Sequence, residues 1–245
     1  MRKRAASLFW LLVLFLTIPV MAMAADYLTQ AEAIYEEDSL ESAIKSLSLY
    51  RKAVEENPDS YEANWKMARA LRRYADLSLQ AEVDDWKNIC KTYGKEGLKY
   101  AEVARDMEPD RVEGNLFYGL SAATYSDGIS ILKAIKEGLR TKTEKAFERA
   151  YEIDKMYDDA APILSLARMW HQLPWPYQKE KTSEKYFEEY YALFPDNPEG
   201  LVYYAELLKD RKKKDRAIEL LKQAAQSGHP YFSKRANELL EEWSK

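Results

Sequence analysis

Apolar residues recur at helical spacing along most of this chain, and the pattern is clearest over residues 201–225. Two runs of periodic residues are separated there by a short polar link, and their members are Leu201, Tyr204, Ala205, Leu208, Ala217, Leu221 and Ala224. Apolar positions three or four residues apart lie on one face of a helix. The small Ala205 and Ala217 would let two such helices approach closely. The pattern therefore predicts a pair of antiparallel helices.

The spacing of the second helix of this pair recurs four times earlier in the chain. In each copy, four positions separate the first key residue from the second, and three separate the second from the third. The copies are Ser46-Tyr50-Ala53, Gly97-Ala101-Ala104, Thr143-Phe147-Ala150 and Ser183-Phe187-Tyr190. They match the tetratricopeptide pattern, in which each repeat is a helical hairpin. We therefore expect an all-α, tetratricopeptide-like helical-hairpin solenoid with about five irregular repeats.

The predicted repeats are interrupted in three places. Residues 77–93 suggest an extra hairpin arm in the second repeat, and residues 127–142 extend the third. Pro174 and Pro176 force a loop over residues 171–182 in the fourth, because proline does not continue a helix. The last stretch, residues 231–245, reads as a capping helix. Its apolar face comprises Phe232, Ala236, Leu239, Leu240 and Trp243.

The first 24 residues have the features of a secretory signal peptide. Three basic residues precede an apolar run from Leu8 to Val20, and Ala22-Met23-Ala24 supplies a cleavage site. We therefore expect the solenoid to occupy residues 25–245 and the protein to be periplasmic or secreted. An uncleaved anchor is the alternative. A lipid anchor is not supported, because no cysteine stands at the cleavage site.

Composition excludes several kinds of function. The formal net charge is −4, so the chain gains nothing from displacing counterions on nucleic acid. The only cysteine, Cys90, has no partner for an internal disulfide and is expected to be buried. Two histidines and one cysteine do not suffice for a typical zinc site, and the common catalytic motifs are missing. We therefore expect a non-enzymatic protein without a metal or cofactor.

The first helices of tetratricopeptide hairpins line a groove, and eight residues are candidates for binding. They are Arg73, Leu116, Leu120, Ala123, Arg168 and His171 on first helices, with Trp175 and Tyr177 in the proline loop. The cationic side chains could receive a carboxylate, or they could pair with Glu113 and Glu206. The uncharged stretch 114–126 could line an apolar pocket, or residues 127–139 could fold back and bury it as core. The sequence leaves both alternatives open.

The region 64–225 resembles the tetratricopeptide-repeat T-component proteins associated with TRAP transporters. The similarity rests on residues 116–138, on residues 143–176 with their "LPWP" loop, and on the hairpin that follows. This resemblance implies a periplasmic protein that self-associates and works with a solute-binding protein. It also implies a cleft for a small hydrophobic or organic-acid ligand. The alternative is a general scaffold for protein–protein interaction in the cell envelope.

Overall fold

The computed structural model describes residues 24, 26–35, 37 and 39–244, and their regular secondary structure is entirely helical. The predicted all-α fold is therefore confirmed. Residues 1–23 of the predicted signal segment lie outside the described residues. A helix over residues 26–35 precedes α2 (Leu40–Glu56), α3 (Tyr61–Gln80), α4 (Trp86–Met107), α5 (Val112–Ile129), α6 (Ile131–Lys136), α7 (Leu139–Asp154), α8 (Tyr157–Gln172), α9 (Glu180–Leu193), α10 (Pro198–Asp210), α11 (Lys214–Ala225) and α12 (Pro230–Ser244).

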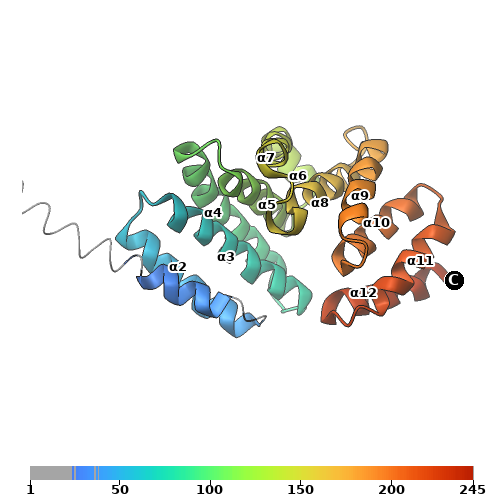
Figure 1. The fold of residues 1–245 in the computed structure, drawn as a ribbon, viewed down its shortest axis with the longest axis horizontal. Helices are drawn as coiled ribbons and strands as arrows, with labels where there is room; N and C mark the ends of the chain where they lie inside the picture. The colour runs from blue at the N-terminus through green and yellow to red at the C-terminus, as the bar shows by residue number, and fades with distance from the viewer. Residues whose placement is uncertain (1–23, 25, 36, 38, 245) are drawn as a thin grey trace, which may run out of the picture. The chain divides into compact units, whose positions relative to one another are not determined.

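The chain divides into two compact units, Met1–Ser130 and Ile131–Lys245. In the first unit, α2, α3, α4 and α5 follow one another side by side, each packed on its neighbour in sequence (Figure 1). Serine side chains begin α2 and α3, because the hydroxyls of Ser39 and Ser60 each accept a backbone N–H of the first turn. The helix over residues 26–35, α2 and α3 share a core that comprises Ala31, Leu47, Tyr50, Ala53, Val54, Ala63, Met67, Ala70 and Leu71.

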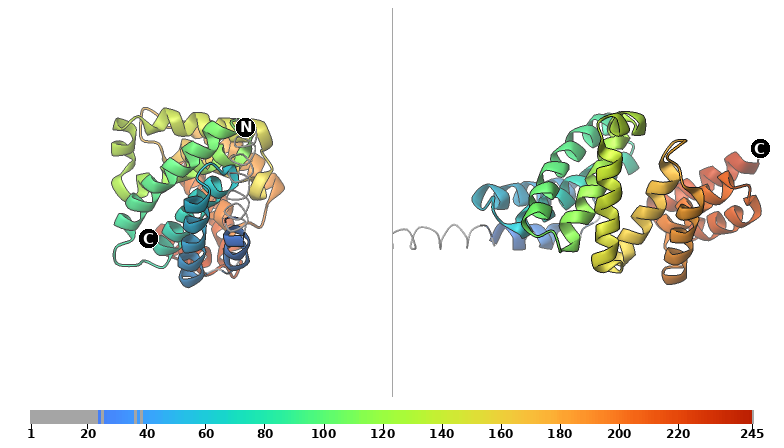
Figure 2. Two further views of the ribbon diagram at one scale, coloured as in Figure 1. Left: turned by 90° about the vertical axis from the view of Figure 1, so that its left-hand side faces the viewer. Right: turned by 90° about the horizontal axis from the view of Figure 1, so that it is seen from above.

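In the second unit, α7 to α12 also pack as successive neighbours, and Figure 2 shows the helices from two further directions. Its core is built from α8 to α12 and includes Ala167, Phe187, Leu201, Ala205, Leu208, Ala217, Leu221, Ala224 and Phe232. The predicted capping helix is α12, whose Phe232, Ala236 and Leu239 are buried. The predicted proline loop lies between α8 and α9.

Every residue of the five second-helix signatures is buried, which supports the predicted hairpin register. The alanines Ala53, Ala101, Ala104, Ala150 and Ala224 have no exposed surface. A methyl side chain is the largest group that allows two helix backbones to approach closely without leaving a void. The spacing found in the sequence thus marks the positions where neighbouring helices touch.

The uncharged stretch 114–126 belongs to α5, which packs on α4 through glycines. A Cβ atom added to Gly94 of α4 would lie 2.7 Å from the Cα atom of Tyr125. One added to Gly114 of α5 would lie 2.7 Å from the backbone nitrogen of Arg105. Real side-chain carbons do not approach backbone atoms so closely, so only glycine fits at either position. Close packing therefore explains why this stretch is neutral and rich in small residues.

The extra hairpin arm expected over residues 77–93 is wrong. This segment instead lengthens α3 to 20 residues and α4 to 22 residues, joined by a short turn over residues 81–85. Both helices continue because no proline or glycine interrupts residues 77–93. Residues 127–142 contain the end of α5, the short α6 and the start of α7, with Gly138 at a φ of 78° between the last two.

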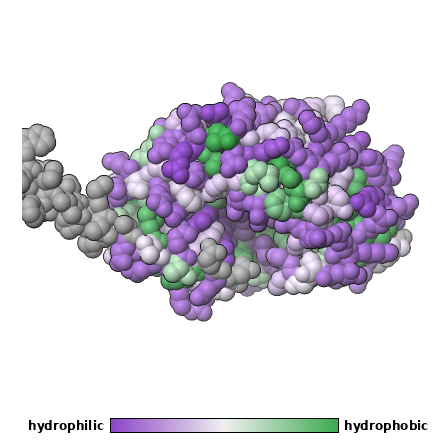
Figure 3. Space-filling view, viewed as in Figure 1, coloured by the Kyte–Doolittle hydropathy of each residue, from purple (hydrophilic) through white to green (hydrophobic). Residues whose placement is uncertain are grey.

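The surface is largely hydrophilic. The face drawn in Figure 3 carries hydrophobic residues only in small, separate patches. Among the described helices, none combines the length and the apolar composition that crossing a membrane would require. Among the large hydrophobic residues that the structure describes, Trp175 is the most exposed, at 87%.

Candidate functional site

A polar groove of about 920 Å³ lies on the second unit, between α8, α10, α12 and the loop after α8. We call it the α8–α12 groove. It is lined by Arg168, His171, Gln172, Leu173, Pro174, Gln178, Glu206, Lys209, Asp210, Lys214, Arg235, Leu239, Glu242 and Trp243. The groove therefore brings together two of the eight predicted binding residues, Arg168 and His171. Their helix, α8, ends where Pro174 and Pro176 prevent its continuation.

Arg168 is held by partners on α10. Its Nη1 atom lies 2.5 Å from Oε2 of Glu206, and its guanidinium carbon lies 3.9 Å from the ring centre of Tyr203. Arg235 of α12 approaches the other oxygen of the same carboxylate, at 3.4 Å. Arg168 therefore pairs with Glu206, which is one of the two alternatives that the sequence left open. One carboxylate between two guanidinium groups leaves this end of the groove with surplus positive charge.

His171 is almost fully enclosed, with 4% of its side chain exposed. Its Nε2 atom lies 2.8 Å from Oδ2 of Asp210, and Gln178 donates a hydrogen bond to its backbone oxygen at 3.0 Å. The Nδ1 atom is buried and has no hydrogen-bond partner among the described residues. A buried polar atom without a partner costs about 1–3 kcal/mol, so this nitrogen lowers the stability of the fold around α8.

The far side of the groove carries lysines and an aromatic ring. Lys209 lies 5.6 Å from the ring centre of Trp243, and neither Lys209 nor Lys214 forms an ion pair within the described part of the chain. Glu242 is the only carboxylate of the lining without a cationic partner there. Arg168 and Arg235, by contrast, are already engaged. The groove therefore offers two available ammonium groups beside an apolar end formed by Leu239 and Trp243.

Two residues of the proline loop, Trp175 and Tyr177, lie outside the α8–α12 groove. Pro174 and Gln178 line the α8–α12 groove, whereas Trp175 and Tyr177 do not. Trp175 extends into solvent, and the Tyr177 ring packs against Arg140, 5.0 Å from its guanidinium carbon. Trp175 is therefore not part of a core. Its role in binding stays a prediction.

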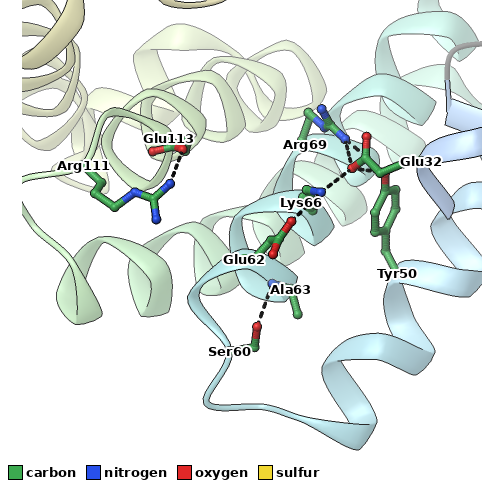
Figure 4. Close-up of polar contacts among 9 residues, drawn as sticks. All are labelled: Glu32, Tyr50, Ser60, Glu62, Ala63, Lys66, Arg69, Arg111 and Glu113. Carbon is green, nitrogen blue, oxygen red and sulfur yellow. Dashed lines mark hydrogen bonds and ion pairs between the residues drawn. The ribbon is translucent and has the colours of Figure 1, made fainter. Parts of the chain in front are cut away.

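Arg73 lies on α3 in the first unit, one turn after Arg69. Arg69 belongs to a charged cluster around Glu32, which Figure 4 shows. Glu32 accepts hydrogen bonds from Tyr50 at 2.8 Å and Arg69 at 2.6 Å, and it lies 2.9 Å from Lys66. Burial raises the pKa of Glu32, but hydrogen bonds from Arg69, Lys66 and Tyr50 outweigh it and lower that pKa to about 2. We call Glu32, Tyr50, Lys66 and Arg69 the Glu32 cluster.

Arg73 contacts the same aromatic ring as Arg69 of this cluster. The Tyr35 ring lies 4.0 Å from the guanidinium carbon of Arg69 and 4.5 Å from that of Arg73. Arg73 also donates a hydrogen bond to the backbone oxygen of Glu37 at 3.0 Å. Arg73 is therefore tied to the segment before α2, and it does not pair with Glu113. Glu113 is instead bonded to Tyr61 and Arg111, as Figure 4 shows for Arg111.

The apolar candidates on α5 differ in exposure. Leu116 is fully buried, Leu120 is half-buried and Ala123 is exposed. Leu116 therefore belongs to the core and does not face a groove. Gly114, two residues before it, contacts α4. Phe117, the next residue, stacks on Trp65 of α3, and the two ring centres are 5.7 Å apart. None of these three residues lines the α8–α12 groove.

Sequence reasoning missed the part of the groove that α12 supplies. Arg235, Leu239 and Trp243 line it together with Lys214 at the start of α11. The pattern marked α12 as a cap, and a cap is expected to cover a core rather than to border a binding groove. The available signal was Trp243, a large aromatic residue among the charges of the final turn.

The α8–α12 groove offers hydrogen-bonding and charged side chains. No set of three His, Cys, Asp or Glu side chains within the described residues is arranged to hold a metal ion. Cys90 lies in the first unit with 1% of its surface exposed, and burial raises the pKa of its thiol to about 12. A thiol with such a pKa stays protonated near neutral pH and is a poor nucleophile. The arrangement is suited to binding.

The fold and the groove define a tetratricopeptide-type helical repeat protein, and comparisons agree. The crystal structure of TTC0263, a thermophilic tetratricopeptide protein of Thermus thermophilus, is similar at 17% identity with a TM-score of 0.64, covering 89% of this chain and 98% of that one. The structure of Pseudomonas aeruginosa pilF is similar at 15% identity with a TM-score of 0.58, covering 92% of this chain and 88% of that one. Such low identity supports the fold alone.

A family assignment comes from the sequence. Residues 27–171 match the model of the family described as "Regulator of microtubule dynamics protein 1-3", and the chain belongs to that family. The match covers the described helices of the first unit and continues through α6 and α7 to His171 in α8. No curated protein matches the chain.

Proposed function

We propose that this protein is a non-enzymatic scaffold whose α8–α12 groove holds an acidic, extended segment of a partner protein. The observation that carries this proposal is the pair Lys209 and Lys214, which have no ion-pair partner in the described chain while the arginines beside them do. Cations without a partner on a groove wall favour a negatively charged ligand and reject a basic one.

The shape and chemistry of the groove suit a peptide better than a flat surface. Its volume of about 920 Å³ lies at the upper end of the range for ligand pockets, and several residues of extended chain would fit. The partly exposed Trp243 offers an apolar contact for one side chain of the segment. A peptide supplies carboxylates, an apolar side chain and backbone hydrogen-bonding groups together.

The finer proposal places the scaffold in the periplasm as an accessory of a TRAP-type transporter, with a solute-binding protein as partner. It rests on the predicted signal segment and on the resemblance of residues 64–225 to T-component proteins. A small organic acid, held by the same lysines, is the ligand that this resemblance adds. The family description names microtubule dynamics, but an exported chain would be separated from microtubules. The proposed role therefore rests on the signal segment and on the resemblance, and the family match supports the relationship of the chain alone.

Site-specific crosslinking in cells tests the groove. A photoreactive amino acid at Gln172, which is exposed and lines the groove, should yield adducts with a partner, whereas one at Lys185, exposed on α9, should not. The double variant Lys209→Glu/Lys214→Glu should abolish the adducts. The matched variant Lys181→Glu/Lys185→Glu changes the charge equally outside the groove and should preserve them.

The identity of the adduct tests the finer proposal, because mass spectrometry would show whether the captured protein is a solute-binding protein. Adducts at Gln172 that survive the loss of Lys209 and Lys214 would contradict the peptide-binding proposal. A different envelope protein, captured in a lysine-dependent way, would leave the scaffold in place and reject the transport role.

A further inference from the structure

A second groove lies on the first unit, between α2 and α4, which both pack against α3. We call it the α2–α4 groove. Its volume is about 630 Å³, and it is lined by Val54, Pro58, Asn64, Lys91, Thr92, Lys95, Glu96, Lys99, Tyr100 and Val103. No residue of this lining belongs to the Glu32 cluster or to the candidates discussed above. The groove is therefore a separate feature of the molecule.

The floor of this groove is apolar and continues along α4. Val54 and Tyr100 pack on the core of the unit, and Val103 is 40% exposed. One turn further, Met107 is 37% exposed. Arg51 of α2 and Glu96 of α4 form an ion pair of 2.5 Å across the groove, which fixes the separation of its walls. The floor is thus a preformed apolar strip that α4 presents to solvent.

Lysines border this strip at regular intervals. Lys91, Lys95 and Lys99 are exposed, and none of them forms an ion pair within the described part of the chain. Four residues of helix rise about 6 Å, so the three ammonium groups form a row along α4. Glu96 is neutralised by Arg51, which leaves Glu55 as the carboxylate near Tyr100. The groove is therefore locally basic on a chain whose formal net charge is −4.

We propose that the α2–α4 groove is a second docking site and that its occupant is an acidic amphipathic helix of a partner protein. Carboxylates spaced four residues apart on a helix have the same rise as the lysine row, so three ion pairs can form in register. Apolar side chains beside them would cover Val54, Tyr100 and Val103. A helix in a groove is a common mode of peptide recognition, whereas a small anion would engage only one of the lysines.

A synthetic helical peptide provides the probe. It carries glutamates four residues apart, each followed by a leucine, and its binding to the full protein is measured by fluorescence anisotropy. The variant Lys91→Glu/Lys95→Glu/Lys99→Glu should weaken binding by about tenfold or more, because three attractions become repulsions. Val103→Asp should also weaken it. Circular dichroism would verify that each variant is folded.

The matched control is Lys142→Glu/Lys145→Glu/Lys185→Glu, which makes the same change of net charge at exposed positions of the second unit. It should alter the affinity by less than about twofold, since none of these three lysines lines the α2–α4 groove. A peptide with glutamine in place of glutamate should not bind.

The proposal is overturned if the acidic peptide shows no saturable binding. It is also overturned if the control variant loses as much affinity as the groove variant, since the effect would then be one of net charge. Sedimentation with phosphatidylglycerol vesicles tests the remaining source of negative charge. Vesicle binding that depends on Lys91, Lys95 and Lys99 without peptide binding would show that the groove faces a lipid surface, and would equally reject the proposal.

Discussion

The pKa of Glu32 gives a quantitative prediction for the stability of the first unit. Hydrogen bonds from Arg69, Lys66 and Tyr50 overcome the effect of burial and lower this pKa from 4.5 to about 2. One pKa unit corresponds to about 1.4 kcal/mol, so the full shift would be worth about 3 kcal/mol at neutral pH. Because 31% of the side chain is exposed, water screens part of this interaction. We expect a contribution of about 1–2 kcal/mol.

The perturbation is Glu32→Gln, which keeps the shape and removes the charge. At pH 7 it should lower the free energy of unfolding by about 1–2 kcal/mol, because Arg69 and Lys66 lose their shared counterion. The folded pKa lies below the unfolded one. The stabilisation is therefore present above about pH 4.5 and is lost as the pH falls toward 2. The difference between variant and wild type should shrink in the same window.

Hydrogen exchange in urea, read by mass spectrometry on peptides from α2 and α3, would measure this difference for the first unit alone. The control is Glu62→Gln, which removes the other carboxylate beside Lys66. Glu62 is 56% exposed, so its loss should cost under about 0.5 kcal/mol. A difference for Glu32→Gln that stays constant from pH 7 to pH 3 would refute the electrostatic reasoning and point to altered packing.

Three further predictions concern packing and reactivity. Ala224→Arg should lower the free energy of unfolding by about 3 kcal/mol or more by burying an unpaired charge, whereas Ala192→Arg on the exposed face of α9 should cost under about 0.5 kcal/mol; equal melting temperatures would reject the repeat register. Gly94→Ala should cost about 1–3 kcal/mol because it forces α4 away from α5, and an unchanged urea midpoint would show that this contact yields easily. Cys90, with a thiol pKa of about 12, should react with a disulfide reagent at pH 8 only after unfolding; prompt labelling of the native protein would contradict its burial.

The helical repeats could be predicted because the residues at helix crossings are small and regularly spaced. Ala53, Ala104 and Ala224 occupy the same place in their hairpins, and backbone contact there tolerates little else. The length of α3 and α4 was misjudged because it depends on where the chain turns. The turn at residues 81–85 contains neither glycine nor proline, so no local signal separates a longer helix from an additional one.

The candidate site was predicted only in part, since a groove depends on residues from distant segments. The register placed Arg168 and His171 on the first helix of their hairpin, and both line the α8–α12 groove. Leu116 was also predicted to line a groove but is buried, because α5 carries no charge on residues 114–126 that would keep this part of the helix in water. Folding brings Glu206 to Arg168 and Arg235 and leaves Lys209 and Lys214 without an ion-pair partner in the described chain. The spacing of residues in the sequence does not reveal this pairing.

The glycine contacts between α4 and α5 also bear on the order in which the first unit unfolds. Their backbones touch at Gly94, Gly114 and Gly128, so either helix can move only if the other moves with it. The two helices are adjacent in sequence, which makes the pair quick to form and cooperative to open. The helix over residues 26–35, which ends the stack, should therefore exchange its amide hydrogens first, and α4 and α5 together should exchange theirs last.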